Sequence, residues 1–300
     1  MPIAAEQAVL AVDIGGTKVA VALVRGAEVL ALEQGRTPAA AGPDAVVAEV
    51  VVRARRLLVG GLAAPDRVGV ACAGVVVDSR VRAMSPELLP GWHDYPLVER
   101  LRAEIELPVS ALNDAQAAAL GEARHGAGRG HDSLLFVTVS TGVGGGLVLG
   151  GRLWQGATGL AGHVGHMAGG ELERVASGTA LERLAAEAGH VGLGAREVIE
   201  EAEAGAGWAL RLVVGAADAL ARALADVRVL VDPEVVVLGG GVGLNAGFRR
   251  AVVAAVERSD PRTRVRVVPA SLGAAAGLVG AACWSGDQRS PSTLPHGEPS

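Results

Sequence analysis

Two glycine-rich turns of the same build, one in each half of the chain, constrain the fold most. The first lies in the segment VLAVDIGGTKVAVALV, residues 9–24, and the second in LLFVTVSTGVGGGLVLG, residues 134–150. Each segment reads as an apolar strand, a turn rich in glycine and threonine, and a second apolar strand. Glycine tolerates positive φ and lets the backbone approach a ligand, so that successive N–H groups can form a nest for phosphate oxygens. Two such hairpins in tandem predict a phosphate-binding protein of two similar lobes that face one nucleotide.

The composition excludes several classes of protein. Half of the 300 residues are apolar but only 2% are aromatic, so Ala, Val and Leu must fill the core. A net charge of −5 without a basic stripe argues against nucleic acid and anionic membranes as partners. Without a signal-peptide pattern or an apolar run of about 18 residues, we expect a soluble cytoplasmic protein. Two cysteines exclude a disulfide framework and a cysteine-based zinc site, and Cys72, within an apolar run, is expected to be a buried, unreactive thiol.

Strand and helix patterns alternate along the chain, which predicts an α/β fold with largely buried sheets. Outside the two hairpins, the expected helices cover residues 43–62, 96–105, 114–125 and 210–230, with another from residue 179, and the expected strands cover 67–77, 109–112 and 235–238. Asp44 is placed to cap the first of these helices. We expect one lobe from residues 1–113, completed by a small-residue helix at about 272–285. Residues 114–271 form the second lobe, and the polar residues 286–300 a disordered tail.

The first turn has neither the spacing of a Walker P-loop nor that of a dinucleotide fingerprint, because its glycines precede a strand rather than a helix. Asp13 ends the first strand, where its carboxylate can hold a metal ion through water. Thr17 and Lys18 can contact phosphate. The predicted phosphate-site residues of this turn are Asp13, Gly15, Gly16, Thr17 and Lys18. A plain hairpin with glycine in its turn is the alternative.

The pair Asn113–Asp114 stands where a short apolar strand meets the start of a helix. Asn or Asp at such a position is commonly an N-cap that accepts hydrogen bonds from free N–H groups. The functional interpretation makes Asp114 a general base that takes a proton from a hydroxyl during phosphate transfer, with Asn113 orienting that hydroxyl. The residues alone leave both interpretations open.

Two further segments are candidates for ligand binding. GLAGHVGHM, residues 159–167, places His163 and His166 three residues apart among glycines, which suits a metal ion or a polar ligand but is also ordinary in a surface loop. VLGGGVG contains Gly239, Gly240 and Gly241 between a strand and a helix, where the backbone can approach an adenosine. A tight turn between strand and helix is the alternative for the second segment.

Taken together and in order, these segments resemble the ROK family of sugar kinases from residue 9 to about residue 284. DIGGTK resembles the first phosphate turn of the family, STGVGGG the second, with Thr141, Gly142 and Gly144, and VLGGGV the glycines on the adenosine side. NDAQAAA resembles the segment that carries the catalytic aspartate, which corresponds to Asp114. The resemblance implies an actin-like ATPase fold of two α/β lobes. It also implies that ATP, with Mg²⁺ near Asp13, phosphorylates a sugar hydroxyl, usually O6, by direct transfer.

Within the family, the segments look most similar to those of the bacterial N-acetylmannosamine kinases of sialic acid breakdown. This resemblance implies phosphorylation of N-acetylmannosamine at O6 and sugar contacts from Gly74, Asn113, His163, His166 and Glu173. Most ROK glucokinases carry Glu at the position of His163, so this histidine bears most on sugar choice. Ser85 stands where the family commonly has Asn.

The chain departs from the family in one loop. ROK enzymes usually have a zinc motif, CxCGxxGCxE, after the histidine that corresponds to His166, whereas here only MAGGEL separates His166 from Glu173. We therefore expect no structural zinc. Since outer contacts orient a ligating imidazole, we hypothesise that a backbone carbonyl or a carboxylate of the shortened loop holds His166 instead.

Two other functions compete with this prediction. One is a glucokinase or another hexose kinase of the same family. The other is a non-catalytic sugar sensor or regulator, although ROK repressors carry an N-terminal helix-turn-helix and the first turn here begins by residue 13. The family resemblance further suggests a homodimer that binds a sugar and ATP.

Overall fold

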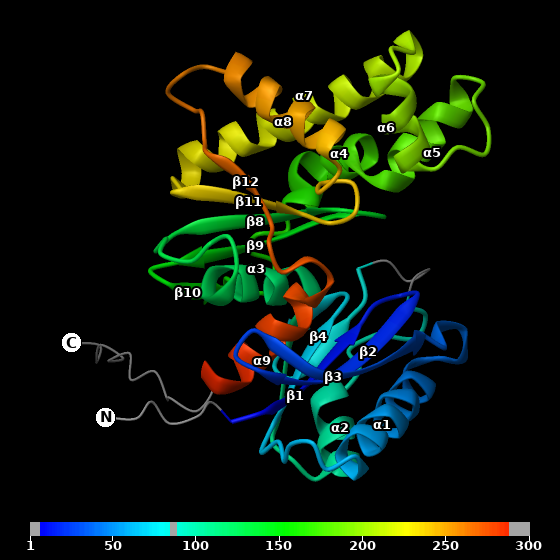
Figure 1. The fold of residues 1–300 in the computed structure, drawn as a ribbon, viewed down its shortest axis with the longest axis vertical. Coiled ribbons are helices and arrows are strands. Elements are labelled where there is room, and N and C mark those ends of the chain that lie inside the picture. The colour runs from blue at the N-terminus through cyan, green and yellow to red at the C-terminus, as the bar shows by residue number, and fades with distance from the viewer. Residues whose placement is uncertain (1–6, 85–88, 288–300) are drawn as a thin grey trace.

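The computed structural model describes residues 7–84 and 89–287, whose strands form two five-stranded sheets built on one plan (Figure 1). The first sheet has the order β3 (Glu28–Arg36), β2 (Lys18–Arg25), β1 (Val9–Ile14), β4 (Val68–Cys72) and β7 (Val109–Asn113). The second has the order β10 (Arg152–Trp154), β9 (Val143–Leu149), β8 (Leu134–Val139), β11 (Val235–Gly239) and β12 (Val267–Pro269). In both sheets the hairpin strands pair antiparallel, and the first of them pairs parallel with the next strand. The predicted α/β class is confirmed.

Helices cover the outer face of each sheet. α1 (Pro43–Val59) and α2 (Leu97–Ile105) pack on the first sheet, below it in Figure 1. The helices beyond the second sheet are α4 (Met167–Ala176), α5 (Gly178–Glu187), α6 (Ala195–Glu203), α7 (Gly207–Val231) and α8 (Ala246–Arg258). Short elements complete the described chain: the ribbon of β5 (Val75–Val77) and β6 (Arg80–Arg82), and the 3₁₀ turns η1 (Ala39–Ala41), η2 (Val164–His166) and η3 (Gly273–Ala275). Within the described residues, no helix has the length and apolar content needed to cross a bilayer.

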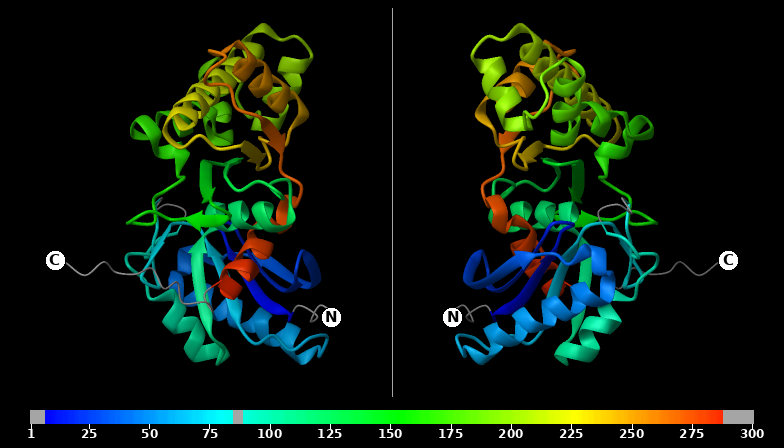
Figure 2. Two further views of the ribbon diagram at one scale, coloured as in Figure 1. Left: turned by 90° about the vertical axis from the view of Figure 1, so that its left-hand side faces the viewer. Right: turned by 90° about the vertical axis from the view of Figure 1, so that its right-hand side faces the viewer.

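Two helices of small residues, α3 (Asp114–His125) and α9 (Ala276–Asp287), lie between the sheets, as the side views also show (Figure 2). The two helices pack closely against each other at glycine residues. A Cβ on Gly280 would lie 1.7 Å from the carbonyl oxygen of Ala117, and one on Gly121 would lie 2.6 Å from that of Ala276. Such contacts are too close for any side chain, so glycine is required at these two positions.

A fully buried carboxylate fixes the segment through which the chain leaves the second sheet for α9. Glu122 on α3 accepts hydrogen bonds from the backbone N–H groups of Ala127 (2.7 Å), Ser271 (3.0 Å) and Leu272 (2.8 Å). Backbone donors thus stabilise the buried charge where no cation pairs with it in the described chain.

The structure corrects several predicted elements. The strand expected over residues 67–77 is two strands, because Gly74 takes φ = +113° and turns the chain between β4 and β5. Gly42 is the N-cap residue of α1, and Asp44 instead accepts hydrogen bonds from Tyr95 and Arg100. Helix α9 extends to Asp287, so residues 286 and 287 are helical rather than part of the expected tail.

Three further expectations concern the tail with Ser85, the boundary between the lobes, and Cys72. Residues 288–300, and Ser85 with them, lie outside the described residues. The division into lobes at residues 113 and 114 stays a prediction. Cys72 is fully buried in β4, and burial raises the pKa of its thiol, as expected for an unreactive cysteine.

Candidate active site

The first glycine turn, between β1 and β2, is held from both sides by hydrogen bonds. Gly15 N–H donates to the carbonyl of Lys18 at 2.9 Å, and Thr37 Oγ1 donates to the carbonyl of Gly15 at 2.7 Å. Thr37 N–H also donates to the carbonyl of Thr17. These bonds use the carbonyl groups and turn the backbone at Gly16 toward a cavity between the two sheets.

The second turn, between β8 and β9, is held by the start of α5. Gly178 N–H donates to the carbonyl of Ser140 at 2.7 Å, and Thr179 N–H donates to the carbonyl of Thr141 at 3.3 Å. A Cβ on Gly144 would lie 3.1 Å from that of Ala115, so glycine allows this hairpin to lie against α3.

Asn113 takes the N-cap role that the sequence allowed, and it also donates a hydrogen bond to Asp114, the candidate base. Asn113 is the N-cap of α3, since its Oδ1 accepts from the N–H groups of Ala115 and Gln116 at 3.0 and 3.1 Å. Its Nδ2 donates at 2.9 Å both to the carbonyl of Gly74 and to Oδ1 of Asp114. Asp114 Oδ1 also accepts from Ala115 N–H at 2.8 Å. The cap therefore fixes the orientation of the candidate base.

One cavity of about 440 Å³ brings most of the predicted residues together. The predicted residues that line it are Gly15, Gly16, Thr17, Gly74, Asn113, Asp114, Thr141, Gly142, Gly144, His163, His166 and Glu173. Both turns and the predicted sugar-binding residues thus face one space. Met84 and Thr138 line it too, and nothing in their sequence context distinguished them.

Two acidic side chains interact electrostatically beside this cavity. Asp13, Lys18 and Asp114 line an adjoining cavity of about 410 Å³. Burial raises the pKa of Asp13 to about 7; the charge of Asp114 adds to the rise, and Lys18 opposes it. Burial also raises the pKa of Asp114, against the lowering effect of the hydrogen bond from Ala115 N–H. A divalent cation suits such a carboxyl pair, because oxygen ligands and negative charge are what Mg²⁺ binds.

His163 has unused hydrogen-bonding groups. Both ring nitrogens are buried, and neither has a partner in the described residues. Burial lowers the pKa of His163, and the neighbouring His166, whose ring centroid lies 6.5 Å away, lowers it further. The neutral ring offers one donor and one acceptor to a ligand in the cavity.

His166 is exposed at the start of α4, in a short reversal of the chain. Ala168, Gly169 and Gly170 take φ values of 51°, 67° and 84°, so three consecutive left-handed residues form this short loop. No carbonyl or carboxylate of the described chain forms a hydrogen bond or ion pair with the ring of His166, and our hypothesis about its orientation finds no support. The described residues contain no group of three or more His, Cys, Asp or Glu that could hold a metal ion.

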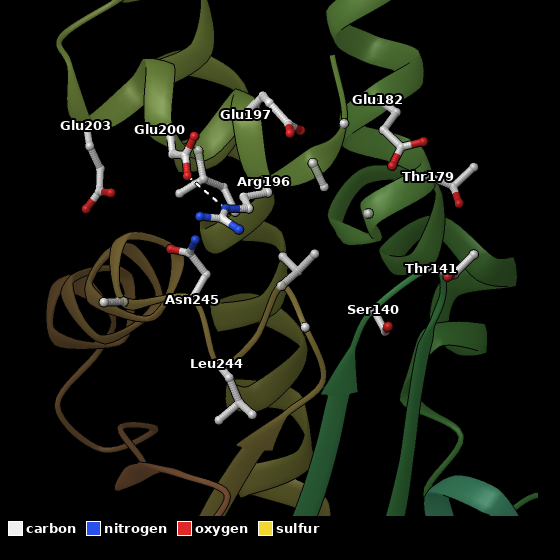
Figure 3. Close-up of a pocket in the computed structure, with 17 residues that line it drawn as sticks. Ser140, Thr141, Thr179, Glu182, Arg196, Glu197, Glu200, Glu203, Leu244 and Asn245 are labelled. Carbon is white, nitrogen blue, oxygen red and sulfur yellow. Dashed lines mark hydrogen bonds and ion pairs between the residues drawn. The ribbon is translucent and has the colours of Figure 1, made fainter. Parts of the chain in front are cut away.

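A larger cavity of about 890 Å³ continues from the second turn, where Ser140 and Thr141 line both spaces (Figure 3). Asn245 reaches into it from the start of α8, where its Oδ1 accepts from Gly247 N–H at 2.8 Å. Around the rim stand Glu182, Arg196, Glu197, Glu200 and Glu203, of which Arg196 pairs with Glu200 at 2.8 Å. In the sequence these carboxylates occupy ordinary solvent-facing positions of helices, so nothing there singles them out.

Gly239 ends β11, and Gly240 and Gly241 follow it; the three glycines do not all face this cavity. Gly241 lines the larger cavity. Gly239 and Gly240 lie outside it: their absent side chains leave room for Phe136 and for the carbonyl of Val139. The predicted nucleotide contacts of all three glycines stay a prediction.

Comparison with known proteins gives consistent matches. The model of the ROK family matches residues 9–288. The N-acetylmannosamine kinase of Yersinia pestis is 39% identical over 296 residues, which cover 92% of this chain and 97% of that protein. The bifunctional enzyme NanE/NanK of Brucella melitensis is 44% identical over 91% of this chain, which spans about half (53%) of that relative's length. The crystal structure of a ROK glucokinase from Streptomyces griseus with glucose and AMPPNP superposes with a TM-score of 0.79 at 30% identity, covering 93% of this chain and 99% of that one.

Proposed function

The chain belongs to the ROK family, and from this membership we propose that it is a kinase that transfers the γ-phosphate of ATP to O6 of N-acetylmannosamine. The observation that carries the proposal is the 440 Å³ cavity, in which two glycine turns and one oriented carboxylate face the same space. Glycine turns suit phosphate, and a fixed carboxylate suits proton transfer from a hydroxyl.

In the proposed reaction Asp114 accepts the proton of O6–H while O6 attacks the γ-phosphorus in line. Asn113 holds one oxygen of that carboxylate at 2.9 Å, so the other is directed to the substrate. Phosphoryl transfer of this kind depends mainly on positioning and on neutralising charge. The two glycine turns supply backbone N–H groups around the phosphates, and Lys18 adds positive charge beside Asp13.

We assign the sugar to the side of the cavity lined by Gly74, Asn113, His163, His166 and Glu173. The unpartnered ring nitrogens of His163 support this, because a buried polar group needs a partner and sugar hydroxyls provide both donors and acceptors. Neutral His163 offers a different pattern of hydrogen bonds from a carboxylate, and this difference would favour the N-acetyl sugar.

The nucleotide would extend from the second turn into the 890 Å³ cavity, with adenosine near Gly241 and Asn245. The acidic rim there repels phosphate, so the base and ribose fit it better than the phosphates do. Mg²⁺ would enter with ATP near Asp13 and neutralise phosphate charge. We also propose that the enzyme is a cytoplasmic homodimer without structural zinc, nucleic acid or membrane partners.

The test is a panel of sugars with Mg²⁺ and ATP. We expect the highest kcat/KM for N-acetylmannosamine, above N-acetylglucosamine and glucose. A preference for glucose would identify a hexose kinase of the same family instead. Sugar binding without turnover of any member of the panel would identify a non-catalytic sensor.

A further inference from the structure

The carboxylate of Glu173 lies against the second glycine turn. Its Oε2 accepts a hydrogen bond from the backbone N–H of Val143 at 2.9 Å, and a Cβ on Gly142 would lie 2.9 Å from the same oxygen. Throughout residues 7–84 and 89–287, no lysine or arginine forms an ion pair with this carboxylate. An uncompensated negative charge therefore stands beside a turn suited to phosphate.

This charge opposes the proposed role of the turn in two ways. Like charges repel, and the repulsion is larger in a partly buried site than in water. The carboxylate also uses the N–H of Val143, which is one of the backbone donors next to the phosphate site. Nucleotide phosphates would bind better if Glu173 turned away.

From its position, the carboxylate of Glu173 can also accept a hydrogen bond from a sugar bound in the same cavity. His166, Glu173 and the turn all line the 440 Å³ space that also contains Asp114. The reversal at Ala168–Gly170 is short, and after it the chain returns so that both His166 and Glu173 reach this space. A sugar hydroxyl there is a donor, and a carboxylate accepts from it readily.

We propose that Glu173 couples sugar binding to nucleotide binding. Without sugar, its carboxylate accepts from Val143 N–H and disfavours phosphate at the turn. When a sugar hydroxyl donates to Glu173, the carboxylate is drawn from the turn and the N–H of Val143 becomes available to phosphate. This inference rests on the proposed function, and Glu173 acts in it by accepting a hydrogen bond directly from the sugar. Because coupling is reciprocal, each ligand tightens the binding of the other.

The test measures the Kd of the Mg²⁺ complex of AMPPNP with and without saturating N-acetylmannosamine. In the natural protein we expect the sugar to tighten binding by about 5- to 150-fold, the usual range of coupling. Glu173→Gln keeps a hydrogen-bond acceptor but removes the charge. Because the amide oxygen can still accept from Val143 N–H, this variant loses only the repulsion, so it should bind the analogue without sugar more tightly than the natural protein does without sugar and show a smaller sugar effect.

Glu171→Gln is the matched control. Glu171 is exposed on the same helix, pairs with Arg174 at 2.8 Å and lines neither cavity, so its loss should leave the sugar effect unchanged. Glu173→Asp shortens the side chain by one methylene and should also weaken the effect, which provides a test should the glutamine variant not fold.

The proposal is overturned if Glu173→Gln retains the natural sugar effect, or if the natural protein shows none. A purely structural role would weaken nucleotide binding equally with and without sugar. Turnover of the sugar panel separates this result from the proposed function: turnover with unaltered coupling in Glu173→Gln counts against the coupling alone, and no turnover of any sugar counts against the kinase.

Discussion

At the residue scale, the site depends on two carboxyl groups placed in different surroundings. Asp114 has its Oδ1 held by Asn113 Nδ2 and by Ala115 N–H. Asp13 lies beside Lys18, and its pKa is raised by burial and further by the charge of Asp114. The surroundings of Asp114 suit a general base, and those of Asp13 suit a carboxylate that binds a cation.

Replacing Asp114 by Asn should abolish the base while keeping the shape of the site. We expect kcat to fall by about 10²- to 10⁴-fold, with sugar affinity nearly unchanged in calorimetry. Because burial raises the pKa of Asp114, the natural enzyme should lose activity on acidification at a higher pH than an ordinary aspartate would give. Near-normal turnover by Asp114→Asn would refute the assignment.

Asp13 predicts how stability depends on pH. An ordinary aspartate has a pKa of 3.8, whereas the pKa of Asp13 in the folded protein is about 7, so between these values the folded protein holds a proton that the unfolded chain has released. Stability from this group is therefore complete below about pH 4 and lost as the pH rises to 7. Asp13→Asn should remove this loss and gain on the order of 4 kcal/mol over the natural protein at pH 8.

Urea unfolding at pH 5 and pH 8, without ligands, checks this expectation. The advantage of Asp13→Asn should grow between the two pH values. An equal difference at both would show that Asp13 is ionised throughout.

The sequence predicts these residues because the relevant neighbours are adjacent in the chain. Asn113 and Asp114 are consecutive, and each glycine turn carries its own pattern. The contact of Glu173 with Val143 joins segments 30 residues apart, and that of Glu122 with Leu272 joins segments 150 residues apart. The local sequence pattern carries no signal for such pairs, so these two contacts could be found only in the structure.

At the element scale, periodicity predicts strands and helices well where no residue takes an unusual backbone conformation. Helix α3 runs from Asp114 to His125, as the sequence indicates. The strand expected through Gly74 ends at Cys72, since a residue at φ = +113° cannot continue a strand. The carbonyl of Gly74 accepts a hydrogen bond from Asn113, so this bend forms part of the site. The sequence gives no sign of that hydrogen bond.

The close contact of α3 with α9 predicts a strong effect of one methyl group. Gly280→Ala would place its Cβ 1.7 Å from the carbonyl oxygen of Ala117, where only movement of a helix can relieve the clash. We expect a loss of about 3 kcal/mol or more in unfolding free energy, at the upper end for overpacking.

Gly286→Ala on the same helix is the matched control. A Cβ there meets only the end of the Arg67 side chain, at 3.8 Å, and alanine favours helix. Stability should stay the same or rise in a urea titration. Equal stability of the two variants would contradict the packing described for α3 and α9.

At the scale of the whole molecule, two sheets of one plan present their glycine turns to the same space, with α3 and α9 between them (Figure 1). The repeated hairpin in the sequence is enough to predict this α/β plan, and the actin-like fold and ROK membership are confirmed. The 890 Å³ cavity could not be predicted, because its walls come from α5, α6 and α8 as well as the second turn. Only the packing of these distant helices creates that space.

The most direct test of the central claim is the product of the natural enzyme. Phosphorus NMR of a reaction with N-acetylmannosamine, ATP and Mg²⁺ should show one sugar phosphate per ADP formed, with the phosphate on O6. Formation of ADP and inorganic phosphate without any sugar phosphate, or phosphate on another hydroxyl, would contradict the account.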